Sequence, residues 1–218
     1  MPTFEERIHA HFDTRIRTLG RIKTRSLGAD SLTLTALNVL VYAQLEGGIK
    51  DLAGCVIHDL NARRPPFGDI NPGLLRWRNP GEVVRLRSMV DFNMIALHSP
   101  FSSALAKRFK VNAINRRNEL NQMGWEAIKQ VYGGFGLNPS TVLGLRTKLD
   151  EIVNDRNEAA HYGVLPGTLG SQMEHHIRDN VFVVENVLTD FSLQILPYFS
   201  SRYCPNTALP HKSGGEQC

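Results

Sequence analysis

The sequence has few cysteines and no long apolar run. Its three cysteines, Cys55, Cys204 and Cys218, are odd in number and unevenly spaced. This argues against a disulfide framework and favours reduced thiols in a cytosol. No segment approaches the roughly 20 consecutive apolar residues of a membrane-spanning helix, and the first residues lack the apolar core of a secretory signal. We therefore expect a cytoplasmic protein without a membrane segment.

The motifs of common metal and nucleophile sites are also missing. Neither Cys-x2-Cys nor His-Glu-x-x-His occurs, and no Gly-x-Ser-x-Gly marks an activated serine. The run Gly133-Gly134-Phe135-Gly136 is not followed by Gly-Lys-Ser/Thr, so we predict a break between helices there and not a nucleotide loop. We predict no metal and no cofactor. The dipeptide His58-Asp59 keeps a metal-dependent helical phosphohydrolase as a minor hypothesis.

What the chain does contain is typical of one globular domain. Of its 218 residues, 42% are hydrophobic and 21% are charged, and a chain of this length can bury a sizeable core. The 25 lysines and arginines exceed the 21 acidic residues, which gives a net charge of +4 and a pI of about 9.1. This is a mild bias toward polyanionic partners.

Apolar residues recur at helical spacing along most of the chain, whereas the alternation typical of strands is absent. The pattern predicts an all-α fold, a single helical domain over 1–202 and a disordered tail over 203–218. The expected helices lie at about 4–23, 30–61, 111–132, 138–162 and 177–196, with one or two shorter ones within 80–110. Pro197 is expected to end the last. Gly47-Gly48 in the second helix predicts a kink or a close helix contact.

An irregular Pro/Gly-rich insertion is expected at about 63–82, because prolines and glycines prevent a long helix there. This insertion and the basic cluster at 107–117 are candidate RNA-binding segments. Their basic residues are Arg63, Arg64, Arg76, Arg78, Lys107, Arg108, Lys110, Arg116 and Arg117. A third basic set lies on the polar face of the first helix: Arg7, Arg15, Arg17, Arg21 and Lys23. That face is either simply solvated or contacts RNA.

The run from Asp155 to Gly163 concentrates the groups suited to phosphate chemistry. It is predicted to form the last turns of a helix that stops at Gly163. Arg156 can hold a phosphate, and His161 can exchange a proton at neutral pH. On an ideal helix these two side chains point about 140° apart, whereas Asn157 and His161 share a face. One site using both therefore needs a distorted last turn, a cleft against another helix, or a second chain.

These residues give the chain a resemblance to the HEPN superfamily of all-α domains. Its metal-independent ribonucleases carry Arg-x4-6-His with a polar residue after the arginine, and Arg156-Asn157-Glu158-Ala159-Ala160-His161 matches this pattern. The segment Tyr42-Ala43-Gln44-Leu45-Glu46-Gly47-Gly48-Ile49-Lys50-Asp51, here called the Glu-Gly run, resembles the long second helix of the RiboL-PSP branch, where an aromatic-alanine-x-x-Glu-Gly pattern is usual. The resemblance spans about residues 30–200.

The resemblance implies a homodimer in which two copies of the Arg-His motif line one cleft. The chemistry implied is attack of an RNA 2′-hydroxyl on the neighbouring phosphorus, which leaves a 2′,3′-cyclic phosphate. His161 would be the general acid or base, Arg156 would bind the phosphate, and Asn157 and Glu46 would support them. Members controlled by tyrosine modification have that tyrosine two residues after the histidine. Here Tyr162 follows directly, which puts this control in doubt, but Tyr162 is still expected near the site as a supporting residue.

Two main functional hypotheses follow. The first is an RNA endonuclease of the toxin or phage-defence type, held inactive or triggered by a partner such as an antitoxin. The second is a non-catalytic HEPN module that binds nucleotides or RNA, or that serves as a dimerising scaffold in a defence or signalling complex. The RNA substrate and the trigger are not encoded in any recognisable motif.

Overall fold

The computed structural model describes residues 2–63, 123–163 and 170–200, without the side chains of 170, 171 and 197–200. Every regular element in these ranges is a helix, which confirms the all-α prediction. The elements are α1 (Phe4–Arg25), α2 (Ser31–Arg63), α8 (Trp125–Phe135), the 3-10 helix η3 (Pro139–Leu145), α9 (Arg146–Tyr162) and α10 (Gly170–Ser200). Apart from Arg63, the predicted insertion, the basic cluster at 107–117 and the tail lie outside the described residues.

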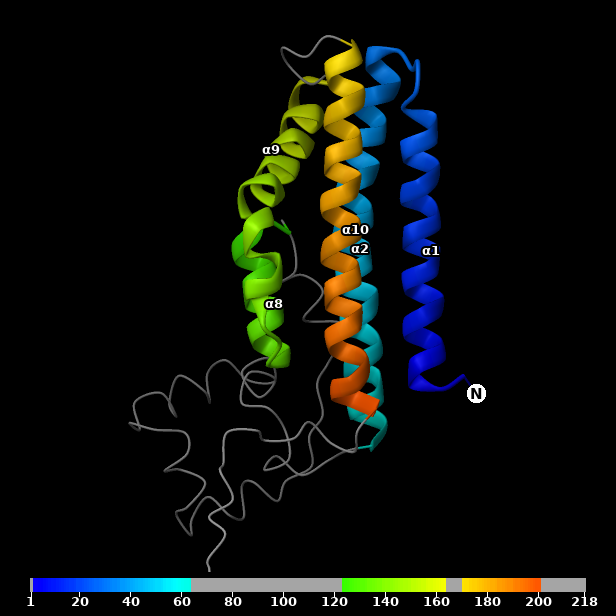
Figure 1. Cartoon of the computed structure of the whole chain (residues 1–218), viewed down its shortest axis with the longest axis vertical. Helices are drawn as coiled ribbons and strands as arrows, with labels where there is room; N and C mark the ends of the chain where they lie inside the picture. Colours follow the sequence, from blue (N-terminus) through cyan, green and yellow to red (C-terminus); the bar gives the residue numbers. More distant parts are fainter. Residues whose placement is uncertain (1, 64–122, 164–169, 201–218) are drawn as a thin grey trace, which may run out of the picture.

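Three long helices lie side by side, and α8 and α9 follow one another along the bundle (Figure 1). The central helix α2 packs against α1, α9 and α10. All members of its predicted stripe are buried: Leu37, Val41, Leu45, Ile49, Leu52, Val56 and Leu60. Cys55 is buried beside this stripe with a free thiol, as expected for a structural cysteine.

The helix α10 supplies the other half of the core. Its predicted stripe is almost completely buried, through Ile177, Val181, Val184, Leu188, Phe191 and Ile195. The helix continues past Pro197 to Ser200, so the predicted end was about one turn too early. A proline removes only one backbone donor, and helix ends are the least defined part of a sequence pattern.

The helix predicted over 111–132 can be compared with the structure only from residue 123, and it differs there at two places. Met123 and Gly124 precede α8, and Gly124 adopts an extended conformation as its N-cap. The helix then continues through Gly133 and Gly134, where a break was predicted, and ends at Gly136 with φ 69°. Burial of Phe135 against Phe191 of α10 at 5.9 Å between ring centroids outweighs the low helix propensity of the glycines.

The segment that leads to the Arg-His motif begins and ends as predicted. The side chain of Asn138 accepts a hydrogen bond from the Ser140 N–H at 3.0 Å and caps the first turn. That turn is the 3-10 helix η3, and α9 follows from Arg146. Gly163 adopts φ 75° and ends α9, with its N–H bonded to the Ala159 carbonyl.

The Gly47-Gly48 pair does not interrupt α2, and Gly48 marks a close helix contact. A Cβ at Gly48 would lie 2.6 Å from a methyl carbon of Leu188, which is completely buried.

Gly48→Ala should therefore strain the contact between α2 and α10 and cost about 1–3 kcal/mol of stability. Gly54→Ala, with nothing within 4 Å of the new Cβ, should gain up to about 1 kcal/mol of helix propensity. Urea unfolding of both variants measures the difference, and equal stabilities would contradict the close contact.

Candidate functional site

Arg156 of α9 lies against the face of α2 that carries the Glu-Gly run. Its guanidinium carbon is 5.4 Å from the centroid of the Tyr42 ring, a cation–π contact. Its Nη1 donates to the Asn157 side-chain oxygen at 3.0 Å. The Tyr42 ring is itself held in place, because its hydroxyl accepts the Met123 N–H at 3.2 Å. Arg156 is thus positioned by neutral groups.

A pocket of ≈ 360 Å³ opens beside this contact, between α1, α2 and α9. It is lined by Arg15, Val39, Tyr42, Ala43, Glu46, Gly47, Lys50 and Arg156. Lys50 and Glu46 form an ion pair one turn apart on α2. Three cations and one carboxylate therefore line the pocket, an arrangement that attracts an anion of the size of a phosphate group.

Arg15 reaches the pocket from α1 across Gly47. Its guanidinium donates to Gln44 at 3.0 Å and to Asp51 at 2.6 Å. A Cβ at Gly47 would lie 2.7 Å from the Arg15 guanidinium, so only glycine lets the side chain cross α2 this closely. Gly47 therefore shapes the wall of the pocket.

Sequence reasoning included Glu46 and Arg156 but missed Arg15 and Lys50 as members of the same site. The sequence placed Arg15 on a basic helix face and gave Lys50 no role, although Lys50 follows Glu46 at the spacing of a helical ion pair. The sequence feature that could have indicated Arg15 is the glycine pair in the second helix, because a glycine lets a side chain of a neighbouring helix approach the backbone closely.

The structure does not bring His161 into this pocket. Its side chain is exposed at the end of α9, and its ring centroid is 6.4 Å from that of Tyr162, which is 74% exposed. The regular helix keeps Arg156 and His161 on different faces, as their spacing predicts. Asn157 contacts Arg156 and not the imidazole. Within one chain the two expected catalytic groups are therefore separate.

A buried polar network holds α9 immediately before Arg156. Asp155 Oδ2 accepts from His176 Nε2 of α10 at 2.5 Å and from Asn38 Nδ2 of α2 at 3.2 Å. Asn180 donates to the Asn38 side-chain oxygen at 2.9 Å, and both asparagines are buried. Sequence reasoning missed this network. The sequence feature that could have predicted it is an asparagine next to the apolar stripe on each of two core helices, Asn38 on α2 and Asn180 on α10.

The network changes the titration of both ionisable members. The hydrogen bond to Asp155 raises the pKa of His176, and burial opposes it only in part. Burial alone would raise the pKa of Asp155, but the bonds from His176, Asn38 and Asn180 together lower it. In the pocket, burial and the nearby Glu46 carboxylate raise the pKa of the Tyr42 hydroxyl, which stays protonated at neutral pH.

The remaining candidates have structural partners or lie elsewhere. Asp59 of the His58-Asp59 dipeptide pairs with Arg63 at 2.9 Å and faces Arg7 at 3.9 Å, so this carboxylate bonds to arginines. Of the candidate RNA-binding residues in the insertion and the basic cluster at 107–117, only Arg63 lies among the described residues, and it donates to Asp59. No three His, Cys, Asp or Glu side chains among the described residues gather to hold a metal ion. No described helix is long and apolar enough to cross a membrane.

The His176–Asp155 pair should make stability depend on pH. The raised pKa of His176 gives a contribution that is complete below the ordinary value of 6.5 and is lost as pH rises through the folded-state pKa. Asp155 stays ionised there, since its pKa lies below 3.8. His176→Gln should cost about 1–3 kcal/mol at pH 5.5 and less at pH 9.

Urea unfolding of the two proteins at both pH values measures this difference. His9→Gln, at an exposed position on α1, is the control and should differ little from the parent at either pH. A penalty for His176→Gln that is the same at pH 5.5 and pH 9 would contradict the charged pair.

Comparison with known proteins adds no relative. No family model matches the chain, and neither a curated protein nor a solved structure matches it significantly. The function is therefore argued from the geometry of the site and from the residues that carry the HEPN resemblance.

Proposed function

We propose that this protein is a metal-independent RNA endonuclease of the toxin or phage-defence type. It acts as a homodimer, cleaves RNA by attack of the 2′-hydroxyl, and is controlled by a partner protein. The observation that carries the proposal is the pocket in which Arg156 of the Arg-x4-His motif meets Tyr42 and Glu46 of the Glu-Gly run. Two sequence motifs more than a hundred residues apart are brought to one cationic pocket.

The pocket suits a phosphodiester better than a neutral ligand. Arg156 has a cation–π contact and one amide bond but no carboxylate partner among the described residues, so its remaining donors are available to an anion. A guanidinium binds phosphate with two parallel hydrogen bonds. Lys50 and Arg15 also line the pocket, but each is paired with a carboxylate, Glu46 and Asp51 respectively. Arg156 is therefore the group that would stabilise the extra charge of a pentavalent transition state.

In the proposed reaction a base removes the proton of the 2′-hydroxyl, and the oxygen attacks the adjacent phosphorus. The bond from phosphorus to the 5′-oxygen breaks, and an acid returns a proton to that leaving oxygen. The products are a 2′,3′-cyclic phosphate and a 5′-hydroxyl. His161 serves as acid or base, and Arg156 holds the phosphate. Because His161 is exposed on another face of α9, it would reach the phosphate bound by the facing subunit.

A second function, a nucleotide- or RNA-binding module without catalysis, is favoured by one observation. The pocket of a single chain is lined by three cations and Glu46 but not by His161. Such a pocket can bind a phosphate without supplying a histidine to move protons. The two functions differ in whether a second chain completes the site.

Cleavage of end-labelled total RNA in EDTA tests the first function. Arg156→Ala should slow cleavage by about 10²–10³-fold through lost charge stabilisation, and His161→Ala by about 10²–10⁴-fold through lost proton transfer. The parent products should carry cyclic phosphate ends. Arg146→Ala, at an exposed position at the start of α9, is the control and should cleave normally.

Mixing the two inactive variants distinguishes a shared site from a site within one chain. In a mixed dimer, one cleft combines Arg156 of one chain with His161 of the other, so random mixing should restore about a quarter of the parent activity. No recovery from an active parent would place both residues in one chain. A folded dimer that binds RNA but never cleaves it, also with the neighbouring gene product added, would favour the binding module.

The Tyr42 ring should position Arg156 independently of the hydroxyl. Tyr42→Phe keeps the ring but leaves the Met123 N–H without its acceptor, so it should lose about 1–3 kcal/mol of stability and retain cleavage. Tyr42→Leu removes the cation–π contact as well and should slow cleavage roughly 2- to 30-fold. Rates measured well below each variant's unfolding midpoint separate the two effects. Equal rates for both variants would exclude positioning by the ring.

A further inference from the structure

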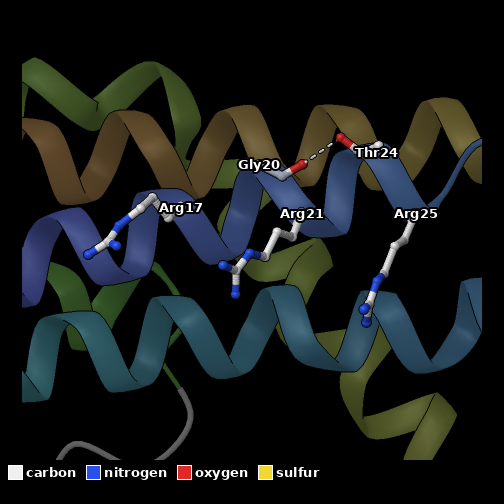
Figure 2. Close-up of a pocket in the computed structure, with 5 residues that line it drawn as sticks. All are labelled: Arg17, Gly20, Arg21, Thr24 and Arg25. Carbon is white, nitrogen blue, oxygen red and sulfur yellow. Dashed lines mark hydrogen bonds between the residues drawn. The ribbon is translucent and has the colours of Figure 1, made fainter.

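The helix α1 carries a row of arginines that the candidate site does not use. Arg17, Arg21 and Arg25 are exposed and follow one another at four-residue spacing, so they lie on one side of the helix. Figure 2 shows their side chains extending the same way from α1. Together with Gly20 and Thr24 they line a shallow hollow of ≈ 330 Å³. Each step along the row is about 6 Å.

The charges of this arginine row are not neutralised within the described residues. The other arginines on this helix that face α2 have acidic partners, since Arg7 lies near Asp59 and Arg15 donates to Asp51. Arg17 instead donates to a backbone carbonyl, that of Asp13 at 3.1 Å. No carboxylate of the described ranges lies within ion-pair distance of Arg17, Arg21 or Arg25. Three permanent positive charges therefore face solvent in a line.

The surroundings of the row argue against a membrane surface as its partner. A helix that lies on a membrane places apolar side chains beside its basic face and inserts them. The apolar side of α1 is instead buried, with Phe4, Ile8, Leu19 and Ile22 in the core. The hollow itself has only a glycine and a threonine between the arginines, so nothing there would enter a lipid layer.

We infer that the row of Arg17, Arg21 and Arg25 binds successive phosphates of a single-stranded RNA that continues past the site. The choice of RNA among polyanions rests on the proposed function, while the row itself rests on its own geometry. A guanidinium pairs with phosphate oxygens through two hydrogen bonds. A single row of guanidiniums can therefore contact the phosphates of a single RNA strand one after another. Arg15 of the same helix lines the site pocket but points to another side of α1 than the row does, so the strand would pass part of the way around this helix to contact both.

Binding of a fluorescent 20-nucleotide RNA with 2′-O-methyl groups tests the inference, because this RNA cannot undergo 2′-hydroxyl attack. The variant Arg17→Gln/Arg21→Gln/Arg25→Gln should bind on the order of 10- to 100-fold more weakly at 0.1 M salt. Its plot of log affinity against log salt concentration should be shallower by about 2, since each phosphate contact on a single strand contributes about 0.7. Anisotropy titrations over a range of salt concentrations give both values.

The control is Lys129→Gln/Arg146→Gln/Lys148→Gln, which removes the same charge from three surface positions on α8 and α9. It should keep the parent salt slope. Equal weakening in both triple variants, or no binding by the parent, would overturn the inference. Binding of the parent to phosphatidylserine vesicles that requires the row, without binding to RNA, would assign a membrane instead. A parent that binds RNA through the row but cleaves none retains this inference and removes the proposed nuclease.

Discussion

The burial of α2 is the interaction on which the rest of the structure depends. Seventeen of its 33 residues are buried, and they face α1, α9 and α10 in turn. A helix this apolar is stable only when other helices cover it on several sides. Val39, Ala43 and Gly47 are not fully covered by the other described helices, and they form the floor of the candidate pocket. The pocket thus lies on a part of α2 that the described helices leave open.

Apolar burial alone would not fix how α9 sits on this core, because the hydrophobic effect has no direction. The directional part comes from Asp155, whose carboxylate accepts hydrogen bonds from both α2 and α10. Hydrogen bonds in a low-dielectric interior are costly to leave unmade, so a shifted helix would be penalised. Arg156 is the next residue, and its place over Tyr42 follows from this anchor. The core and the site therefore share one set of contacts.

The fold was largely predictable because its signals are periodic and local. The stripes of α2 and α10, the stop at Gly163 and the cap at Asn138 each follow from spacing or from the chemistry of one residue. The end of α8 was not predictable, because burial of Phe135 decides it and depends on a distant helix. The residues of the site likewise fall into those that the sequence predicts and those that only the packing reveals. Arg156 and Glu46 stand in recognisable motifs, whereas Arg15 joins them only through the packing of α1 across Gly47.

The separation of Arg156 from His161 is the constraint that the proposed mechanism has to meet. To bring His161 into its own pocket, the last turn of α9 would have to unwind. That would break the bond from Gly163 to Ala159 and expose Ala159, which is buried. In the proposed homodimer a second chain would avoid this cost, because its exposed His161 could approach the pocket while both helices stay intact. The helical period is thus a reason to propose a site shared between two subunits, since that arrangement would require the least change in the fold.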